Sequence, residues 1–292
     1  MTETSKNFYS KVLLFGEYTV TLGSGALAIP YQGFRGHSDY GHGHDESRKN
    51  LFRLLSYVSK TDLIENVYDL EAFTKDLENG LYFSSNIPAG YGLGSSGAVV
   101  AWFYHSYSTR KTTNLGTLKN ILGATENAFH GSSSGIDPLV SYIHEPLMIK
   151  DSNDISIVNP NLKNKGLFLL DTGLPRETAP LVAAFKEKYL HHDSFKETVH
   201  NLSEYNRAAI QSILGDISND LYANFHNISA LQYEHFSEMI PLSFRKLWLS
   251  GLQSEQFYLK LCGAGGGGMI LGMLKDQTHY PQELTDFTIT FL

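Results

Sequence analysis

A glycine- and serine-rich segment at residues 88–98 has the residue types of an anion-binding loop. It reads Pro-Ala-Gly-Tyr-Gly-Leu-Gly-Ser-Ser-Gly-Ala and lies between a strand-like run at 81–85 and an apolar run at 98–103. Glycines let backbone N–H groups converge on an anion, and a helix N-terminus adds donors and the positive end of its dipole. Ser95 and Ser96 add hydroxyls that suit phosphate oxygens or a hard cation. The segment therefore predicts a polyphosphate site.

Other glycine-rich templates fit this segment less well. Residues 92–97 match G-x-G-x-x-G, but a dinucleotide-binding fold needs an acidic residue about twenty positions later, and residues 111–117 provide none. The sequence lacks the G-K-[ST] triplet of a P-loop and the H-R-D and D-F-G motifs of protein kinases. A glycine-rich turn that only reverses the chain stays open at this point.

A polar turn rich in serine and glycine, which follows a helical pattern, is a second segment that could carry chemistry. Glu126 ends a helical pattern that begins at Leu115, and Asp137 follows it in Gly-Ser-Ser-Ser-Gly-Ile-Asp. Residues 131–135 also match the nucleophile elbow G-x-S-x-G of hydrolases. That elbow requires a buried strand before the serine, where this chain has a helical pattern, so a hydrolase is kept only as an alternative.

These segments resemble the motifs of the GHMP kinases (galacto-, homoserine, mevalonate and phosphomevalonate kinases), most of all those of the branch that phosphorylates mevalonate. Residues 88–98 are similar to the family's phosphate-binding loop. The stretch from Lys11 to Tyr18 resembles its first motif, although Phe8-Tyr9-Ser10 replaces Ala-Pro-Gly and Tyr18 replaces histidine.

Three later segments extend the resemblance along the chain. Residues 131–137 are similar to Gly-x-Pro-Ser-Gly-x-Asp, with Ser133 in place of proline. Residues 175–178 are similar to Pro-Arg-x-Thr, whose arginine meets a substrate carboxylate in that family. Residues 260–273 form a strand, a glycine-rich turn and a strand, and resemble the third motif.

The resemblance implies a small-molecule kinase that uses ATP and Mg²⁺ and phosphorylates the primary hydroxyl of (R)-mevalonate. It implies that Asp137 faces the attacking hydroxyl with Lys11 beside it, and that Ser96 and Glu126 ligate Mg²⁺. The implied nucleotide-binding residues are Gly90, Gly92, Leu93, Gly94, Ser95 and Ser96. The implied substrate-binding residues are Glu17, Tyr18, Arg176, Thr178, Gly265 and Gly266.

The residues taken alone also fit plainer interpretations. Lys11 could be a surface lysine at a strand edge, and Glu126 could lie on a solvated helix face. Arg176 could be a solvated residue at a helix N-terminus, and residues 260–273 could form a simple hairpin. The alternatives for function are another GHMP kinase, such as a phosphomevalonate or homoserine kinase, or a relative that binds nucleotide without catalysis.

The resemblance also implies an α+β fold with two domains and ATP in the cleft between them. The expected domains are an N-terminal ribosomal-protein-S5-like ATP-binding domain at 1–155 and a C-terminal ferredoxin-like α/β sandwich at 156–292. The residue patterns predict the following elements. Strands are expected at 11–15, 19–22, 26–29, 81–85, 146–150 and 166–170, and helices at 50–59, 70–77, 115–126 and after 178. Apolar positions at 231, 236 and 240 predict a later helix.

Residues 35–49 are polar and glycine-rich, and we expect a surface loop there. The histidines His37, His42 and His44, with Asp45, could be drawn as metal ligands, but nothing in the sequence fixes their geometry.

The composition indicates a globular protein without a nucleic-acid or membrane partner. The chain has 292 residues, of which 42% are hydrophobic, and a formal net charge of −7. No apolar run approaches 18 residues. The single cysteine, Cys262, excludes an internal disulfide and favours the reducing cytoplasm. A homodimer is compatible with this composition.

Overall fold

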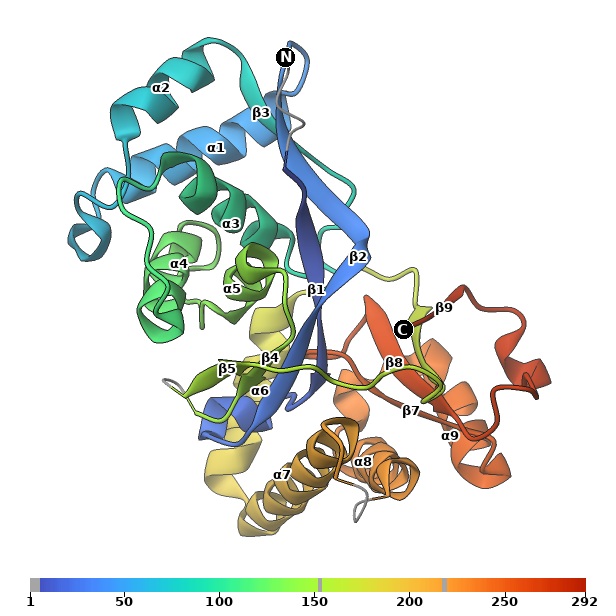
Figure 1. The fold of residues 1–292 in the computed structure, drawn as a ribbon. Helices are drawn as coiled ribbons and strands as arrows, with labels where there is room; N and C mark the ends of the chain where they lie inside the picture. The colour runs from blue at the N-terminus through green and yellow to red at the C-terminus, as the bar shows by residue number, and fades with distance from the viewer. Residues whose placement is uncertain (1–5, 152–153, 217–219) are drawn as a thin grey trace. The chain divides into compact units, whose positions relative to one another are not determined.

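The computed structural model describes residues 6–151, 154–216 and 220–292, which form two compact units (Figure 1). Unit 1 comprises the segment that ends at Lys11, together with Ile29–Pro88 and Leu93–Glu145. Unit 2 comprises Val12–Ala28, Ala89–Gly92 and Pro146–Leu292. The chain therefore passes from one unit to the other several times, and it does so twice within the predicted phosphate loop, before Ala89 and after Gly92.

Helices and strands follow one another in runs along the described chain (Figure 1). The strands are β1 (Phe8–Phe15), β2 (Ala26–Tyr40), β3 (Leu81–Ser85), β4 (Leu147–Ile149), β5 (Ile155–Ile157), β6 (Leu167–Asp171), β7 (Phe257–Leu261), β8 (Met269–Leu274) and β9 (Ile289–Phe291). The α-helices are α1 (Asp45–Val58), α2 (Leu70–Glu78), α3 (Ser95–Tyr107), α4 (Leu115–His130), α5 (Ile136–Ile143), α6 (Thr178–His191), α7 (Asp193–Ile213), α8 (Leu221–His235) and α9 (Arg245–Ser254).

Unit 1 is built around the buried helix α3. Helices α4 and α5 pack against it, and its side chains are apolar on nearly all sides, as expected of a helix that neighbours surround. The Phe103 ring centroid lies 4.7 Å from that of Phe73 and 4.4 Å from that of Tyr68, in tilted contacts that hold α3 against α2 and the segment before it. The first residue of α3 comes directly after the glycine-rich loop, so this packing also fixes the loop's C-terminal end.

Unit 2 contains an antiparallel sheet with the strand order β7-β8-β6-β9. Counted along the chain, this is the order two-three-one-four that is typical of ferredoxin-like domains. Helices α8 and α9 pack against β7, and α7 packs against α8. The glycine-rich turn that joins β7 to β8 is therefore held by two fully buried strands. The expected α+β fold is confirmed.

The strand predicted at 19–22 is wrong, because Thr19–Leu22 is a short 3₁₀ helix. Tyr18 before it and Gly23 after it both have left-handed backbone angles, with φ of 64° and 84°. Such residues reverse the chain on either side, so an extended strand cannot form between them.

The loop predicted at 35–49 is also wrong over most of its length. Residues 36–40 belong to β2 and pair with β3 in the register Gly36↔Ser85 to Tyr40↔Leu81, and α1 begins at Asp45. The polar composition indicated a loop, but polar side chains can also lie on the solvent-facing side of a strand whose backbone is paired. Within the described residues, no group of three or more histidine, cysteine or acidic side chains could hold a metal ion.

Two further differences concern element boundaries. The polar segment between β4 and β6 contains β5, which pairs with β4 in the register Leu147↔Ile157 to Ile149↔Ile155. The helix expected through residue 240 ends at His235 as α8, and Phe236 and Ile240 are buried beyond its end. Hydrophobic spacing marked these residues as core without distinguishing helix from turn.

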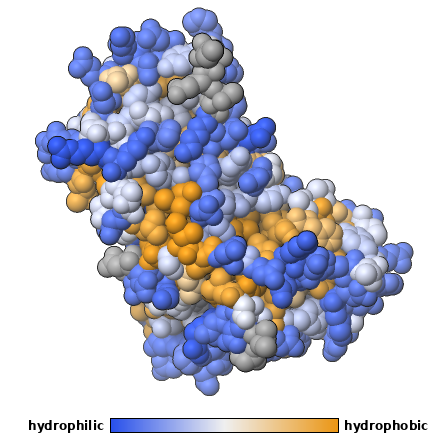
Figure 2. Space-filling model, in the orientation of Figure 1, coloured by the Kyte–Doolittle hydropathy of each residue, from blue (hydrophilic) through white to orange (hydrophobic). Residues whose placement is uncertain are grey.

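The face drawn in Figure 2 is largely hydrophilic, with one gathering of apolar side chains. Among the helices that the structure describes, none combines the length and hydrophobicity that crossing a bilayer requires.

Candidate active site

The C-terminal half of the glycine-rich loop forms the N-terminus of helix α3. Gly94 is the N-cap with φ of 77°, and as a glycine it has no side chain with which to cap the helix. The N–H groups of the first turn therefore remain available as donors to an anion, and the helix dipole favours a negative charge there. Lys11 donates its backbone N–H to the Leu93 carbonyl at 2.9 Å, which holds the loop against β1.

Lys11 and Asp137 form an ion pair within unit 1. The Lys11 Nζ lies 3.0 Å from the Asp137 Oδ1, and the lysine side chain is 9% exposed. Asp137 is in the first turn of α5, whose N-terminus reaches α3 because Gly97 has no side chain. A Cβ at Gly97 would lie 2.9 Å from the Asp137 carbonyl carbon, a distance that would push the two helices apart. The plainer interpretation of Lys11 as a surface lysine is therefore wrong.

Glu126 is a buried carboxylate that accepts two serine hydroxyls. Ser96 Oγ donates to its Oε1 at 2.7 Å, and Ser133 Oγ donates to its Oε2 at 2.5 Å. Burial, followed by the negative charge of Asp137, raises the pKa of Glu126 to about 7, while the two serines and Lys11 oppose this shift. The solvated-carboxylate interpretation of Glu126 is therefore wrong.

The residues at Glu126 fit a divalent cation. The carboxylate is only 4% exposed and lies near a second carboxylate, that of Asp137. A bound cation would offset both the loss of hydration and the repulsion between the two negative charges. Ser96 Oγ and the Glu126 carboxylate are hard oxygen donors, which Mg²⁺ prefers, and nucleotide phosphates usually complete such a site. The two predicted metal ligands are therefore brought together by the fold.

His130 is a site residue that sequence reasoning missed. Its Nε2 lies 2.9 Å from Ser96 Oγ, the same hydroxyl that contacts Glu126. It is the last residue of α4, four positions after Glu126, so both side chains lie on one face of the helix. That four-residue spacing was the available sequence signal.

A second group of predicted residues lies together in unit 2, around Arg176. Its backbone N–H donates to the Gly90 carbonyl at 2.9 Å, and its Nη1 donates to the Gly265 carbonyl at 2.6 Å. Gly92 has φ of 68°, a backbone conformation that favours glycine, and a Cβ there would also overlap the guanidinium group in its present position. Arg176 thus connects the first half of the loop with the β7–β8 turn, and its interpretation as a solvated arginine is wrong.

The other predicted substrate residues differ in exposure. The Tyr18 hydroxyl donates to the Ala264 carbonyl at 2.6 Å, and the centroid of its ring lies 4.6 Å from that of Phe185. Glu17 is completely buried, and its Oε1 contacts the Nζ of Lys260, which sequence reasoning did not single out. Thr178 is exposed at the start of α6. The contacts within unit 2 therefore bring Arg176 and Tyr18 to the glycine-rich turn. Glu17 is instead buried against Lys260.

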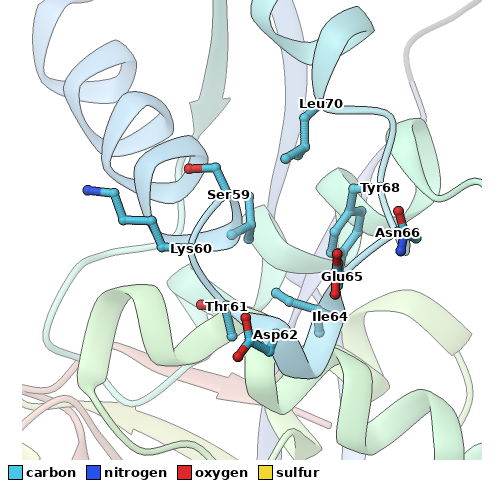
Figure 3. A pocket seen from close by; sticks show the side chains of 10 residues that line it. Ser59, Lys60, Thr61, Asp62, Ile64, Glu65, Asn66, Tyr68 and Leu70 are labelled. Atoms are coloured by element: carbon cyan, nitrogen blue, oxygen red, sulfur yellow. The ribbon is translucent and has the colours of Figure 1, made fainter.

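Two pockets lie within single units. One in unit 2, of about 540 Å³, is lined by Arg176 and Gly266 with apolar side chains that include Leu181 and Ile240. The other, in unit 1, has about 340 Å³ and is drawn in Figure 3. It lies where the chain joins α1 to α2, and residues such as Lys60, Asp62 and Tyr68 line it. None of its ten lining residues belongs to the predicted site.

Comparison with known proteins shows what this chain is similar to. Residues 56–144 match the model of the GHMP kinases N terminal domain. Among curated proteins, it is 26% identical over 222 residues to mevalonate kinase of Arabidopsis thaliana. The match covers 67% of this chain and 56% of that protein. Matches to the mevalonate kinases of Dictyostelium discoideum and Aeropyrum pernix cover 58% and 60% of those proteins. The chain therefore matches little more than half the length of these relatives.

Solved structures show the same fold at low sequence identity. Mevalonate kinase of L. major, in complex with R-mevalonate, superposes with a TM-score of 0.66 at 17% identity, covering 95% of this chain and 89% of that one. Phosphomevalonate kinase of Streptococcus pneumoniae superposes with a TM-score of 0.67 at 14% identity, covering 98% of each chain. The recognition of the GHMP kinase fold from the sequence is confirmed.

Proposed function

We propose that this protein is a kinase that transfers the γ-phosphoryl group of ATP to the primary hydroxyl of (R)-mevalonate. The product would be 5-phosphomevalonate, an intermediate of isoprenoid biosynthesis. The observation that carries the proposal is the group around Asp137 in unit 1. There an aspartate paired with Lys11 neighbours a serine paired with a buried glutamate, all beside the helix N-terminus that follows the glycine-rich loop.

This group supplies what phosphoryl transfer needs. The reaction has little covalent chemistry for the protein to perform, and catalysis depends on positioning and on charge stabilisation. Asp137 would orient the acceptor hydroxyl and accept its proton. Lys11, with its Nζ at 3.0 Å, would balance the negative charge of the reacting groups.

The loop and α3 would hold the nucleotide phosphates. Backbone N–H groups at Gly94, Ser95 and Ser96 would donate to phosphate oxygens at the helix N-terminus. Ser96 Oγ and Glu126 would hold Mg²⁺, which neutralises phosphate charge when it is bound. The proposed division into an ATP-binding domain at 1–155 and a C-terminal domain at 156–292 follows from the same family resemblance.

Arg176 would bind the acceptor carboxylate in unit 2. A guanidinium group can donate two parallel hydrogen bonds to a carboxylate, and Nη1 is already oriented by the Gly265 carbonyl. The adjoining pocket of about 540 Å³ combines this arginine with apolar residues, which suits an acid with a short branched carbon chain. Three curated relatives named mevalonate kinase support this choice of acceptor.

Phosphomevalonate is the second candidate acceptor. The fold of a phosphomevalonate kinase superposes as well as that of a mevalonate kinase. The pocket beside Arg176 is also lined by a second arginine, Arg245, and arginine often binds phosphate. Glu177 and Glu238 line the same pocket and disfavour a dianion, so mevalonate is the first choice.

An ADP-release assay with mevalonate, phosphomevalonate, homoserine and galactose as acceptors tests the proposal. We expect the highest kcat/KM with mevalonate, with dependence on Mg²⁺. The proposal fails if another acceptor is turned over faster, or if ATP binds but no acceptor is phosphorylated. The latter outcome would support a nucleotide-binding relative without activity.

A further inference from the structure

The Ser96 hydroxyl has two neighbours, which together determine where its proton lies. Its Oγ is 2.7 Å from Glu126 Oε1 and 2.9 Å from His130 Nε2. A serine hydroxyl has one proton to donate and two lone pairs that accept. A carboxylate that ligates a metal is ionised and can only accept, so the Ser96 proton points to Glu126. His130 must therefore donate its Nε2–H to Ser96.

This arrangement leaves a single lone pair on Ser96 Oγ. One direction around the oxygen holds the proton shared with Glu126, and a second receives the His130 N–H. The remaining lone pair is the one with which the oxygen could ligate a cation. Without His130, the oxygen would retain two lone pairs open to a cation, and the Ser96 side chain would lose one of the two hydrogen bonds that hold it.

We propose that His130 is a positioning residue that orients Ser96 as a metal ligand. The inference rests on the proposed function, because it concerns the Mg²⁺ that would accompany ATP. His130 acts through Ser96 and is not itself a ligand.

The fold supports this role. His130 is exposed, so its imidazole contributes little to the core, whereas Ser96 is half-buried and Glu126 is buried. Gly131, with φ of 73°, ends α4 directly after His130 and lets the chain turn back so that Ser133 reaches Glu126. Hydrogen bonds to metal ligands commonly change metal affinity by roughly 10- to 100-fold when they are removed.

The test measures Mn²⁺ binding by electron paramagnetic resonance, using the full chain with a non-hydrolysable ATP analogue and no acceptor. We expect His130→Leu to weaken Mn²⁺ binding by roughly 10-fold or more. His130→Gln should retain most of the affinity, because the glutamine amide N–H reaches about as far as Nε2. His200→Leu, at an exposed histidine of α7, is the matched control and should bind as wild type does.

Three results would overturn the inference. The first is wild-type Mn²⁺ affinity in His130→Leu, and the second is an equal loss in His130→Gln and His130→Leu. The third is a loss of nucleotide affinity in His130→Leu that is as large when the metal is chelated as when it is present. That result would indicate that His130 contacts the phosphates directly. If the wild-type protein binds no Mn²⁺–nucleotide complex, the proposed function fails. The choice of acceptor does not enter this measurement.

Discussion

Lys260 and Glu17 form an ion pair whose two side chains are completely buried in unit 2. The Lys260 Nζ lies 2.5 Å from Glu17 Oε1 and also donates to the carbonyls of Leu14 and Leu261, at 2.9 and 2.8 Å. All three ammonium protons are therefore used. The pair connects β7, just before the glycine-rich turn, to the segment that leads into Tyr18.

Removing one partner of this pair should be costly, because the other charge would stay buried without compensation. Burial already raises the pKa of Glu17, and Lys260 is the main influence that opposes the shift. We expect Lys260→Met to lower the free energy of unfolding by about 3–5 kcal/mol in chemical denaturation. Lys260→Met combined with Glu17→Met should be less destabilised than the single variant.

The matched control is Lys150→Met, which breaks an exposed pair with Asp154 at 3.5 Å. This variant should unfold close to wild type, since exposed pairs contribute little. Equal stability of Lys260→Met and Lys150→Met would contradict the importance of the buried pair.

Asp137→Asn should lower kcat by on the order of 10² or more and leave the KM for ATP nearly unchanged. An amide cannot accept the acceptor's proton, whereas nucleotide binding depends on the loop and α3. Steady-state kinetics measure both constants. Asp154→Asn, in the exposed pair with Lys150, serves as the control. Wild-type turnover in Asp137→Asn would remove this residue from the mechanism.

Arg176→Ala should raise the KM for mevalonate far more than the KM for ATP. Loss of a charged hydrogen-bond partner costs about 1.5–3 kcal/mol, which corresponds to roughly 10- to 100-fold in affinity. Arg176→Gln keeps a donor for the Gly265 carbonyl. It therefore tests whether the rise in KM comes from loss of the contact with the turn or from loss of the positive charge. Arg207→Ala on α7, an exposed arginine, is the control. An unchanged KM for mevalonate would contradict the carboxylate assignment.

His105 should make unit 1 sensitive to acid. Burial lowers its pKa to about 4, with further lowering by Lys6, Lys111 and His144. Between the ordinary value of 6.5 and about 4, the unfolded chain binds a proton that the folded chain does not. Stability therefore falls as pH falls through this range.

Thermal unfolding at about pH 7.5 and about pH 5 checks this expectation. His105→Gln should show a smaller loss of Tm on acidification than wild type, although His144, whose pKa is also lowered by burial, keeps part of the effect. His200→Gln, at an exposed position, should lose as much Tm on acidification as wild type does. An unchanged loss in His105→Gln would mean that other groups govern acid stability.

The sequence by itself determined the local features of this protein. The glycine-rich loop, the start of α3 beside Ser95, and the turn between β7 and β8 follow from residue types, since glycine and serine act on the backbone close to their own positions. The order of these segments along the chain was also sufficient to recognise the GHMP kinase fold.

Only the tertiary structure decided which side chains meet. Lys11 and Asp137 are far apart in the chain, and Glu17 and Lys260 are separated by 243 positions. The second contact of Ser96, with His130, and the strand pairing over residues 36–40 were likewise missed. Periodicity tells which face of an element is buried, but not which other element covers it. Those partners are determined by packing between elements distant in sequence, whose loop-closure cost is met only when the whole fold forms.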